Sequence, residues 1–457
     1  MKEVLCPRIN VIREAFAYQS RFTGSTMIFK IDFPIIASSG FSYLMKDIAL
    51  LVNGGIRVVI VPGCKEWIDA VLLEHSVLSE YSGGERITSE NAIPLVEMAA
   101  FNVATRYMTA LSASRVDAVV GNFTRARGRG VINGIDMMYT GTVDKIFTQA
   151  MRRILDLGVV PILPCIGWSS TGKSYNVPSD EIAIAAASAL GAAKLFIVTG
   201  GDYLKKEQLA TPAHTRYTDE GRILRLNPRE AEEILFLNKN DGETGKEKEK
   251  CLGMLRFALS ASASGVERVH IINGCEEGAV LNELFTNLGS GTMLYADEYE
   301  AIRGIHNSDI PDILHIMEPL IRQDILIRRS AEDVQKKKDD YVVYVVDGSV
   351  HACGALHDLG DGQAELAALA SDKAYSSMNI GRRIVHYLIE KARNLGMKRV
   401  LVFTTKTQDW FELLGFRETS IDTLPRQRRE NYNYKRMSKI FALELNAPQN
   451  AAHGSTR

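Results

Sequence analysis

Short apolar runs alternate with longer amphipathic segments through about residue 295 of this 457-residue chain. The runs have the length of strands, and six of them are predicted strands: 27–31, 58–62, 118–121, 159–164, 195–199 and 269–273. The segments between them include four predicted helices: 42–53, 89–112, 143–157 and 180–190. Strands that alternate with helices in this way indicate a mainly parallel sheet covered by helices on both faces.

A different pattern starts near Glu300. The run YVVYVV, closed by Asp347 and Gly348, predicts a strand and the turn of a hairpin. The other expected elements are helices at 309–322, 381–395 and 408–414 and strands at 350–356, 365–370 and 399–404. This change of pattern predicts two domains, residues 1–296 and 297–446, followed by a flexible tail at 447–457.

Composition and charge exclude several classes of protein. The net charge of −1 argues against a general nucleic-acid binder, and there is no apolar run long enough to predict a membrane span. The N-terminus has charged residues where a secretory signal would be apolar. The six cysteines contain no CxxC pair, and the nine histidines form no ligand-spaced cluster. We therefore expect a cytoplasmic protein that binds no metal, no nucleic acid and no membrane.

The strand at 365–370, the loop after it and the helix that begins near Gly381 form a pattern suited to an acyl-CoA. Loop amides and a helix N-terminus bind phosphates, and free strand-edge amides bind the pantetheine and the thioester carbonyl. The segment from Ala374 to Glu418 resembles GNAT acetyltransferases. The resemblance implies acetyl-CoA as co-substrate and the contacts Leu369, Ser376, Ser377, Asn379, Gly381 and Arg382. The sequence departs from the family signature, because only Gly381 is kept, Asn379 replaces the middle glycine and Ser376 replaces the basic residue.

Three further stretches resemble bacterial N-acetylglutamate synthases: QDILIRRSAEDV (323–334), ELAALA (365–370) and LPRQRRENYNYKRMSKIFALEL (424–445). The resemblance implies acetyl transfer from acetyl-CoA to the α-amino group of L-glutamate, the first step of arginine biosynthesis. The family's substrate-binding residues fall on Arg328, Arg436 and Ser438. Arginine suits this role because a guanidinium binds a carboxylate through two hydrogen bonds of fixed geometry.

The ammonium group of glutamate must lose a proton before its nitrogen can attack a thioester. Glu365, at the head of its strand, matches the family's glutamate and is the candidate base. Ala368 stands where the family has a cysteine, so we expect direct attack without an acyl-enzyme. The general acid stays open between Thr405 and Tyr432.

The first domain resembles the amino-acid kinase fold, on the stretches ERIT (85–88), GIDMMYTGTV (134–143), 174–199 and 265–294. The fold class expected for the whole chain is therefore α/β, with an amino-acid kinase-like three-layer αβα sandwich followed by a GNAT α/β domain. Phosphoryl transfer requires glycine-rich turns and lysines around the phosphates. Here the first turn reads Lys30-Ile31-Asp32-Phe33, the second contains Cys64-Lys65-Glu66, and the late lysine region reads Gly253-Met254-Leu255-Arg256. These three losses argue against a bifunctional synthase–kinase.

The same resemblance implies a regulatory site for L-arginine. Its residues fall on Tyr18, Lys194, His270, Glu283, Gly289 and Gly291. A carboxylate such as Glu283 suits a guanidinium or ammonium group. The family also implies a homo-oligomer, a hexamer by resemblance. One alternative from a different class stays open: an arginine-sensing regulatory protein with a weak or inactive acetyltransferase domain.

Overall fold

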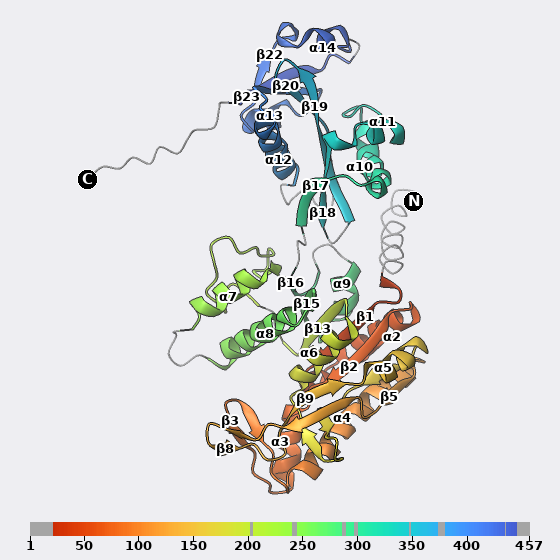
Figure 1. Ribbon diagram of the computed structural model, residues 1–457, viewed down its shortest axis with the longest axis vertical. Coiled ribbons are helices and arrows are strands. Elements are labelled where there is room, and N and C mark those ends of the chain that lie inside the picture. The colour runs from red at the N-terminus through yellow and green to blue at the C-terminus, as the bar shows by residue number, and fades with distance from the viewer. Residues whose placement is uncertain are drawn as a thin grey trace, which may run out of the picture. The chain divides into compact units, whose positions relative to one another are not determined.

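The computed structural model describes residues 22–201, 204–239, 245–285, 289–296, 300–346, 349–372, 380–434 and 436–445. The chain forms two compact units, Met1–Asp297 and Glu298–Arg457 (Figure 1). Tyr18, Ser376, Ser377, Asn379 and the tail at 447–457 lie outside the described residues.

An eight-stranded sheet forms the centre of the first unit. Its strand order is β14-β16-β15-β13-β1-β2-β10-β5, and neighbouring strands are parallel except for the pair β15 and β16. The bounds are β1 Thr26–Ile31, β2 Arg57–Pro62, β5 Ala118–Val120, β10 Val160–Ile162, β13 Lys194–Thr199, β14 Arg225–Leu226, β15 Arg268–Asn273 and β16 Thr292–Tyr295. The six predicted strands all belong to this sheet, because a parallel strand buried on both faces is a continuous apolar run.

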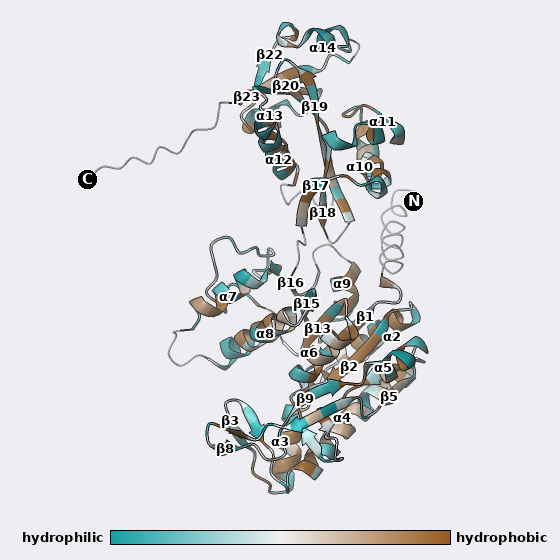
Figure 2. Cartoon of the chain, in the orientation of Figure 1, coloured by the Kyte–Doolittle hydropathy of each residue, from teal (hydrophilic) through white to brown (hydrophobic). Residues whose placement is uncertain are grey.

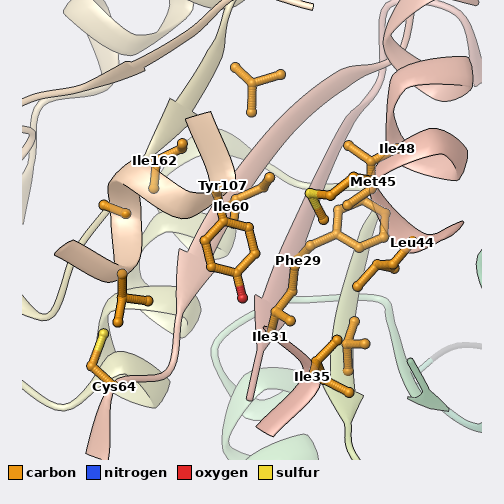
Figure 3. Packing of buried hydrophobic residues seen from close by; sticks show 14 of the residues in the cluster. Phe29, Ile31, Ile35, Leu44, Met45, Ile48, Ile60, Cys64, Tyr107 and Ile162 are labelled. Atoms are coloured by element: carbon orange, nitrogen blue, oxygen red, sulfur yellow. The ribbon is translucent and has the colours of Figure 1, made fainter. Parts of the chain in front are cut away.

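Helices cover both faces of this sheet. The first layer contains η1 Phe33–Ala37, α2 Gly40–Asn53, α3 Lys65–Glu74, α4 Ile93–Ala113 and α9 Ala279–Phe285. The second contains α5 Thr148–Asp156, α6 Ser179–Leu190, α7 Pro228–Leu237 and α8 Lys246–Ala263. Successive side chains of β1 point to opposite faces of the sheet. Phe29 and Ile31 pack against the first layer of helices, and Ile28 packs against the second. Figure 3 shows Phe29 beside the apolar side chains of α2, and Figure 2 shows how hydrophobic the sheet strands are. This is the three-layer αβα sandwich that the sequence predicts.

Short strands beside the main sheet correct one prediction. A four-stranded sheet and two hairpins contain β6 Thr124–Gly128, β9 Gly141–Ile146, β11 Ile166–Trp168, β12 Ser174–Asn176, β3 Glu80–Ser82, β4 Glu85–Ile87, β7 Val131–Ile132 and β8 Ile135–Asp136. The helix predicted over 143–157 was wrong in its first part, because β9 pairs with β6 there and α5 begins only at Thr148. Tertiary pairing outweighs local helical periodicity in this segment.

The second unit contains a seven-stranded sheet of order β17-β18-β19-β20-β21-β23-β22. Only β20 and β21 are parallel neighbours. The bounds are β17 Glu300–Gly304, β18 Tyr341–Val346, β19 Ser349–Gly360, β20 Gln363–Ser371, β21 Arg399–Thr404, β22 Arg417–Thr419 and β23 Lys439–Glu444. The helices are η2 Asn307–Asp309, α10 Ile310–Arg322, α11 Ala331–Lys336, η3 Lys338–Asp340, α12 Ile380–Asn394, α13 Gln408–Leu413, η5 Ile421–Thr423 and α14 Arg426–Glu430. Core residues of α10 and α11 pack on one face and those of α12 and α13 on the other, as expected for an α/β domain.

Candidate functional site

The central strand β20 is bent at Ala368. It pairs with β21 only from Gln363 to Leu366, although it continues to Ser371. On its other side the pairing with β19 shifts register between Cys353 and Ala355, and Ala368 has a φ of 53°. Such a conformation costs a non-glycine residue roughly 1–3 kcal/mol, so it persists only where the surroundings impose it. The bend leaves the backbone edge of β20 beyond Leu366 without its β21 neighbour.

A cavity of about 390 Å³ opens at this bend. It is lined by five of the residues that the sequence proposes for substrate or co-substrate: Glu365, Leu369, Gly381, Arg436 and Ser438. Gly381 lies in the first turn of α12, so this helix begins at the cavity wall. Arg382 is exposed on α12, with its Nε 3.3 Å from Nε2 of His386, and does not line the cavity.

The carboxylate of Glu365 is held by Arg428. The Arg428 Nε lies 2.8 Å from Oε2 of Glu365, and its Nη2 lies 3.3 Å from Oε1. The guanidinium also lies 4.1 Å from the centre of the Phe403 ring. Both charged side chains are mostly buried, with 15% and 22% exposed. Arg428 was not among the residues that the sequence pointed to, and the only signal for it was the group of arginines in the segment 424–445.

Arg436 lines the cavity, and one of its donors has no hydrogen-bond partner among the described residues. Its Nη2 donates to the backbone carbonyls of Asp324, at 3.1 Å, and Ile325. Its Nε is buried and has no hydrogen-bond partner among the described residues. A buried donor of this kind costs free energy unless a ligand accepts its hydrogen bond, and a carboxylate is the natural acceptor.

The hydroxyl groups near the cavity bear on the open question of the general acid. Tyr432 lines the cavity, but its hydroxyl donates to the carbonyl of Ser438 at 2.6 Å. Thr405 is exposed and is not part of the lining, whereas its neighbours Thr404 and Thr407 are, with their hydroxyls 2.7 Å apart.

A thiol lines the cavity but is unsuited to nucleophilic attack. Cys353 is buried, and its Sγ donates to the carbonyl of Ala368 at 3.3 Å. Burial raises the pKa of this thiol to about 12. The reactive form of cysteine is the thiolate, so Cys353 is inert at neutral pH.

In the first unit, four of the residues proposed for the effector form one hydrogen-bonded cluster: Lys194, His270, Glu283 and Gly291. The Oε1 of Glu283 lies 2.6 Å from Nδ1 of His270, and its Oε2 accepts from the amides of Ser290 at 2.7 Å and Gly291 at 2.8 Å. Lys194 joins the cluster through its Nζ, 3.3 Å from Nε2 of His270. Burial opposes ionisation of Glu283, but the contacts with His270, Gly291 and Ser290 outweigh it and lower the pKa of this carboxyl.

The turn at Gly289–Gly291 requires glycine at both ends. Gly289 has a φ of 62°, and a Cβ there would lie 2.4 Å from Oε2 of Glu283. A Cβ on Gly291 would lie 2.2 Å from the carbonyl oxygen of Ile271. Glycine at positions 289 and 291 avoids these clashes and lets the amides of Ser290 and Gly291 reach the carboxylate.

A larger cavity of about 750 Å³ in the first unit contains the altered kinase motifs. The Nζ of Lys30 lies 2.6 Å from Asp32 and 2.9 Å from Asp180. Burial would lower the pKa of Lys30, but these two carboxylates raise it. The ammonium is therefore neutralised by the protein itself. Phe33, in place of a glycine, stacks on Trp67 with ring centres 5.7 Å apart.

Both units of the chain match known protein families. Residues 30–273 match the amino acid kinase family, and residues 308–416 match the acetyltransferase (GNAT) family. A curated amino-acid acetyltransferase from Mannheimia succiniciproducens is 32% identical over 440 residues, which cover 95% of this chain and 97% of the relative. This chain belongs to the amino-acid acetyltransferase family. Another member, from Yersinia pseudotuberculosis, is 31% identical over 97% of this chain and 100% of its own length.

Solved structures support the same family membership of this chain. The N-acetylglutamate synthase of Neisseria gonorrhoeae, complexed with coenzyme A and L-arginine, is 31% identical and covers 96% of this chain and 99% of its own, with a TM-score of 0.83. The same enzyme complexed with coenzyme A and N-acetyl-glutamate gives a TM-score of 0.58 over the same coverage. This chain therefore joins a kinase-like unit and a GNAT unit. No helix in the described ranges is long and apolar enough to cross a membrane. No group of three His, Cys, Asp or Glu in those ranges is placed to hold a metal ion.

Proposed function

We propose that this chain is an N-acetylglutamate synthase, which transfers the acetyl group of acetyl-CoA to the α-amino group of L-glutamate. One observation carries the proposal: the cavity beside the bent strand is lined by three guanidinium groups and one carboxylate, those of Arg329, Arg428, Arg436 and Glu365. These three positive charges and one negative charge leave a net charge of +2. Glutamate brings two carboxylates that this positive charge can bind and an ammonium group whose proton Glu365 can accept.

The chemistry follows from the residues at the cavity. Glu365 takes a proton from the ammonium of glutamate, and the freed nitrogen attacks the thioester carbonyl. The oxyanion that forms is stabilised by backbone amides on the free edge of β20. The carbon–sulfur bond then breaks, and coenzyme A leaves as a thiolate that takes up a proton. Direct attack suits a site in which position 368 is alanine and the thiol of Cys353 is protonated.

The proposal is tested by following thiol release from acetyl-CoA at millimolar glutamate. We expect coenzyme A and N-acetylglutamate to appear in equal amounts, and no release when glutamate is omitted. Absence of coenzyme A release would instead support the alternative, an arginine-sensing regulator with an inactive acetyltransferase unit.

We further propose that L-arginine regulates the enzyme by binding at the cluster around Glu283. The relative from Neisseria gonorrhoeae was crystallised with L-arginine. The cluster offers a buried carboxylate with a lowered pKa, which suits a guanidinium or ammonium group, beside a glycine turn whose amides contact that carboxylate. Tyr18 belongs to this proposal by family resemblance alone. The same resemblance extends the proposal to a cytoplasmic homo-oligomer, a hexamer.

Replacing Glu283 by glutamine is expected to leave acetyl transfer intact while weakening the response to arginine. Glutamine keeps the shape of the side chain but removes the negative charge, and hydrogen bonds to a charged group contribute about 1.5–3 kcal/mol. The arginine concentration that gives half of the effect should therefore rise by roughly 10- to 100-fold. The measurement is a titration of arginine into the thiol-release assay.

The matched control is Glu267→Gln, on an exposed carboxylate just before β15. It should leave the arginine titration unchanged. A Glu283→Gln enzyme with the arginine response of the parent would show that the effector binds elsewhere.

A further inference from the structure

The end of α10 forms part of the wall of the cavity beside the bend in β20. The helix ends at Arg322, and the amide of Asp324 donates to the carbonyl of Ile321 at 3.0 Å. The next amide, that of Ile325, donates to the carbonyl of Leu320 at 2.9 Å. This pair of hydrogen bonds is the Schellman motif, in which the residue at position 324 is left-handed and is usually glycine. Here it is an aspartate with a φ of 58°, and both Leu320 and Ile325 line the cavity.

Two cationic side chains bind the carbonyls that follow this turn. The Nζ of Lys406 donates to the carbonyl of Gln323 at 3.0 Å. The Nη2 of Arg436 donates to the carbonyl of Asp324 at 3.1 Å and to that of Ile325. Carbonyls at the C-terminal end of a helix have no partner within the helix, and the helix dipole favours a positive charge beside them. Lys406 and Arg436 therefore stabilise the end of α10 in the position at which Ile325 lines the cavity.

Lys406 lies on the loop between β21 and α13, which forms a different part of the cavity lining. Thr404 and Thr407 of this loop both line the cavity, and Oγ1 of Thr404 accepts from the amide of Thr407 at 3.0 Å. The hydroxyl of Thr405 donates to the carbonyl of Asp324 at 3.5 Å, beside the contact of Lys406. The ammonium of Lys406 therefore joins two segments of the lining that lie 83 positions apart in the chain.

We propose that Lys406 is a positioning residue for the acceptor amino acid, because it holds the end of α10 and with it the part of the cavity wall that contains Ile325. The inference rests on the proposed function, since it takes this cavity as the place where an amino acid accepts the acetyl group. Lys406 is not one of the residues that line the cavity, so it acts through the backbone of Gln323. A left-handed aspartate costs free energy, and the turn at Asp324 keeps its shape only while the contacts around it favour that shape.

The first test is Lys406→Met, which removes the ammonium but keeps a long side chain. The KM for glutamate should rise about 3- to 10-fold, a modest effect because the contact is exposed. The KM for acetyl-CoA should stay unchanged, since acetyl-CoA is proposed to bind at the start of α12. Lys406→Arg keeps a charged donor and should restore most of the affinity for glutamate. The matched control is Lys391→Met: the Nζ of Lys391 also donates to a backbone carbonyl, that of Asp339 at 2.7 Å, but outside the cavity. It should leave both KM values as in the parent.

A second variant tests whether Lys406 acts through the turn at Asp324. Glycine adopts the left-handed conformation without a steric cost, so Asp324→Gly should make the turn less dependent on Lys406. The effect of Lys406→Met on the KM for glutamate should therefore be smaller in the Asp324→Gly enzyme than in the parent. Equal effects in the two enzymes would contradict the inference.

Hydrogen exchange tests the same contact without turnover. The amides of Asp324 and Ile325, which close the turn, should exchange faster in Lys406→Met than in the parent or in Lys391→Met. The inference is overturned if their exchange is unchanged, if the KM for glutamate is unchanged, or if both KM values rise equally. If the parent releases no coenzyme A with glutamate, the proposed function fails, and the exchange rates alone then show whether Lys406 holds this wall.

Discussion

The Glu365→Gln enzyme is expected to bind both substrates and to turn over about 10²- to 10⁴-fold more slowly than the parent. A carboxamide has nearly the shape of the carboxylate but cannot take the proton from the ammonium group of glutamate. The loss should appear in kcat measured by thiol release at saturating glutamate and acetyl-CoA. The KM for acetyl-CoA should stay unchanged, because Glu365 is proposed to act only on the amine.

The ion pair with Arg428 also predicts how the Glu365→Gln enzyme binds glutamate. In the parent, Glu365 holds the Arg428 guanidinium through two nitrogens. Glutamine weakens that hold and makes the guanidinium available, so glutamate should bind no more weakly than before and the effect should be confined to kcat. Glu418→Gln is the control, since Glu418 on β22 pairs with Lys439 and is 54% exposed outside the cavity. A Glu365→Gln enzyme with the parent's kcat would remove Glu365 from the mechanism.

The sequence predicted the framework of both units better than the details of the cavity. Strands such as β1 and β13 were recognisable because burial on both faces makes them apolar without interruption. The strand β9 was not, because it is defined by pairing with β6, which lies earlier in the chain, and the local pattern continued into α5. Pairing between strands is a tertiary property that local periodicity does not report.

The site could be predicted one residue at a time but not as an arrangement. Glu365 and Arg436 came from family resemblance, and the structure brings both to one cavity. The partner of Glu365 lies 63 positions later, on α14, and no local pattern connects the two. The bend at Ala368 was also invisible, because alanine does not suggest a left-handed backbone. The family resemblance placed a substrate contact on Arg328, but the structure shows Arg328 69% exposed and paired with Glu318, while its neighbour Arg329 lines the cavity.

Replacing Arg436 by alanine is expected to raise the KM for glutamate by about 30-fold or more and to leave the KM for acetyl-CoA unchanged. Truncating one partner of a buried charged hydrogen bond costs about 2–5 kcal/mol, and each 1.4 kcal/mol is a factor of ten in affinity. The buried Nε of Arg436 has no partner among the described residues, so a substrate carboxylate gains a donor there at no cost to the protein. Initial rates over a range of glutamate concentrations give the result.

Arg436 also joins the segment between α14 and β23 to the loop after α10, because its Nη2 donates to the carbonyls of Asp324 and Ile325. Loss of this contact alone would lower thermal stability, so the KM must be compared between variants that are folded at the assay temperature. Arg436→Lys separates the two roles: lysine keeps the charge but cannot bind the carbonyls and a carboxylate through one planar group. It should fall between alanine and the parent in KM. Arg426→Ala is the control, since Arg426 on α14 is 92% exposed and paired with Glu430, and this variant should match the parent. An Arg436→Ala enzyme with a normal KM for glutamate and reduced stability would show that Arg436 acts only in stabilising the fold. Another residue of the cavity would then bind the carboxylate.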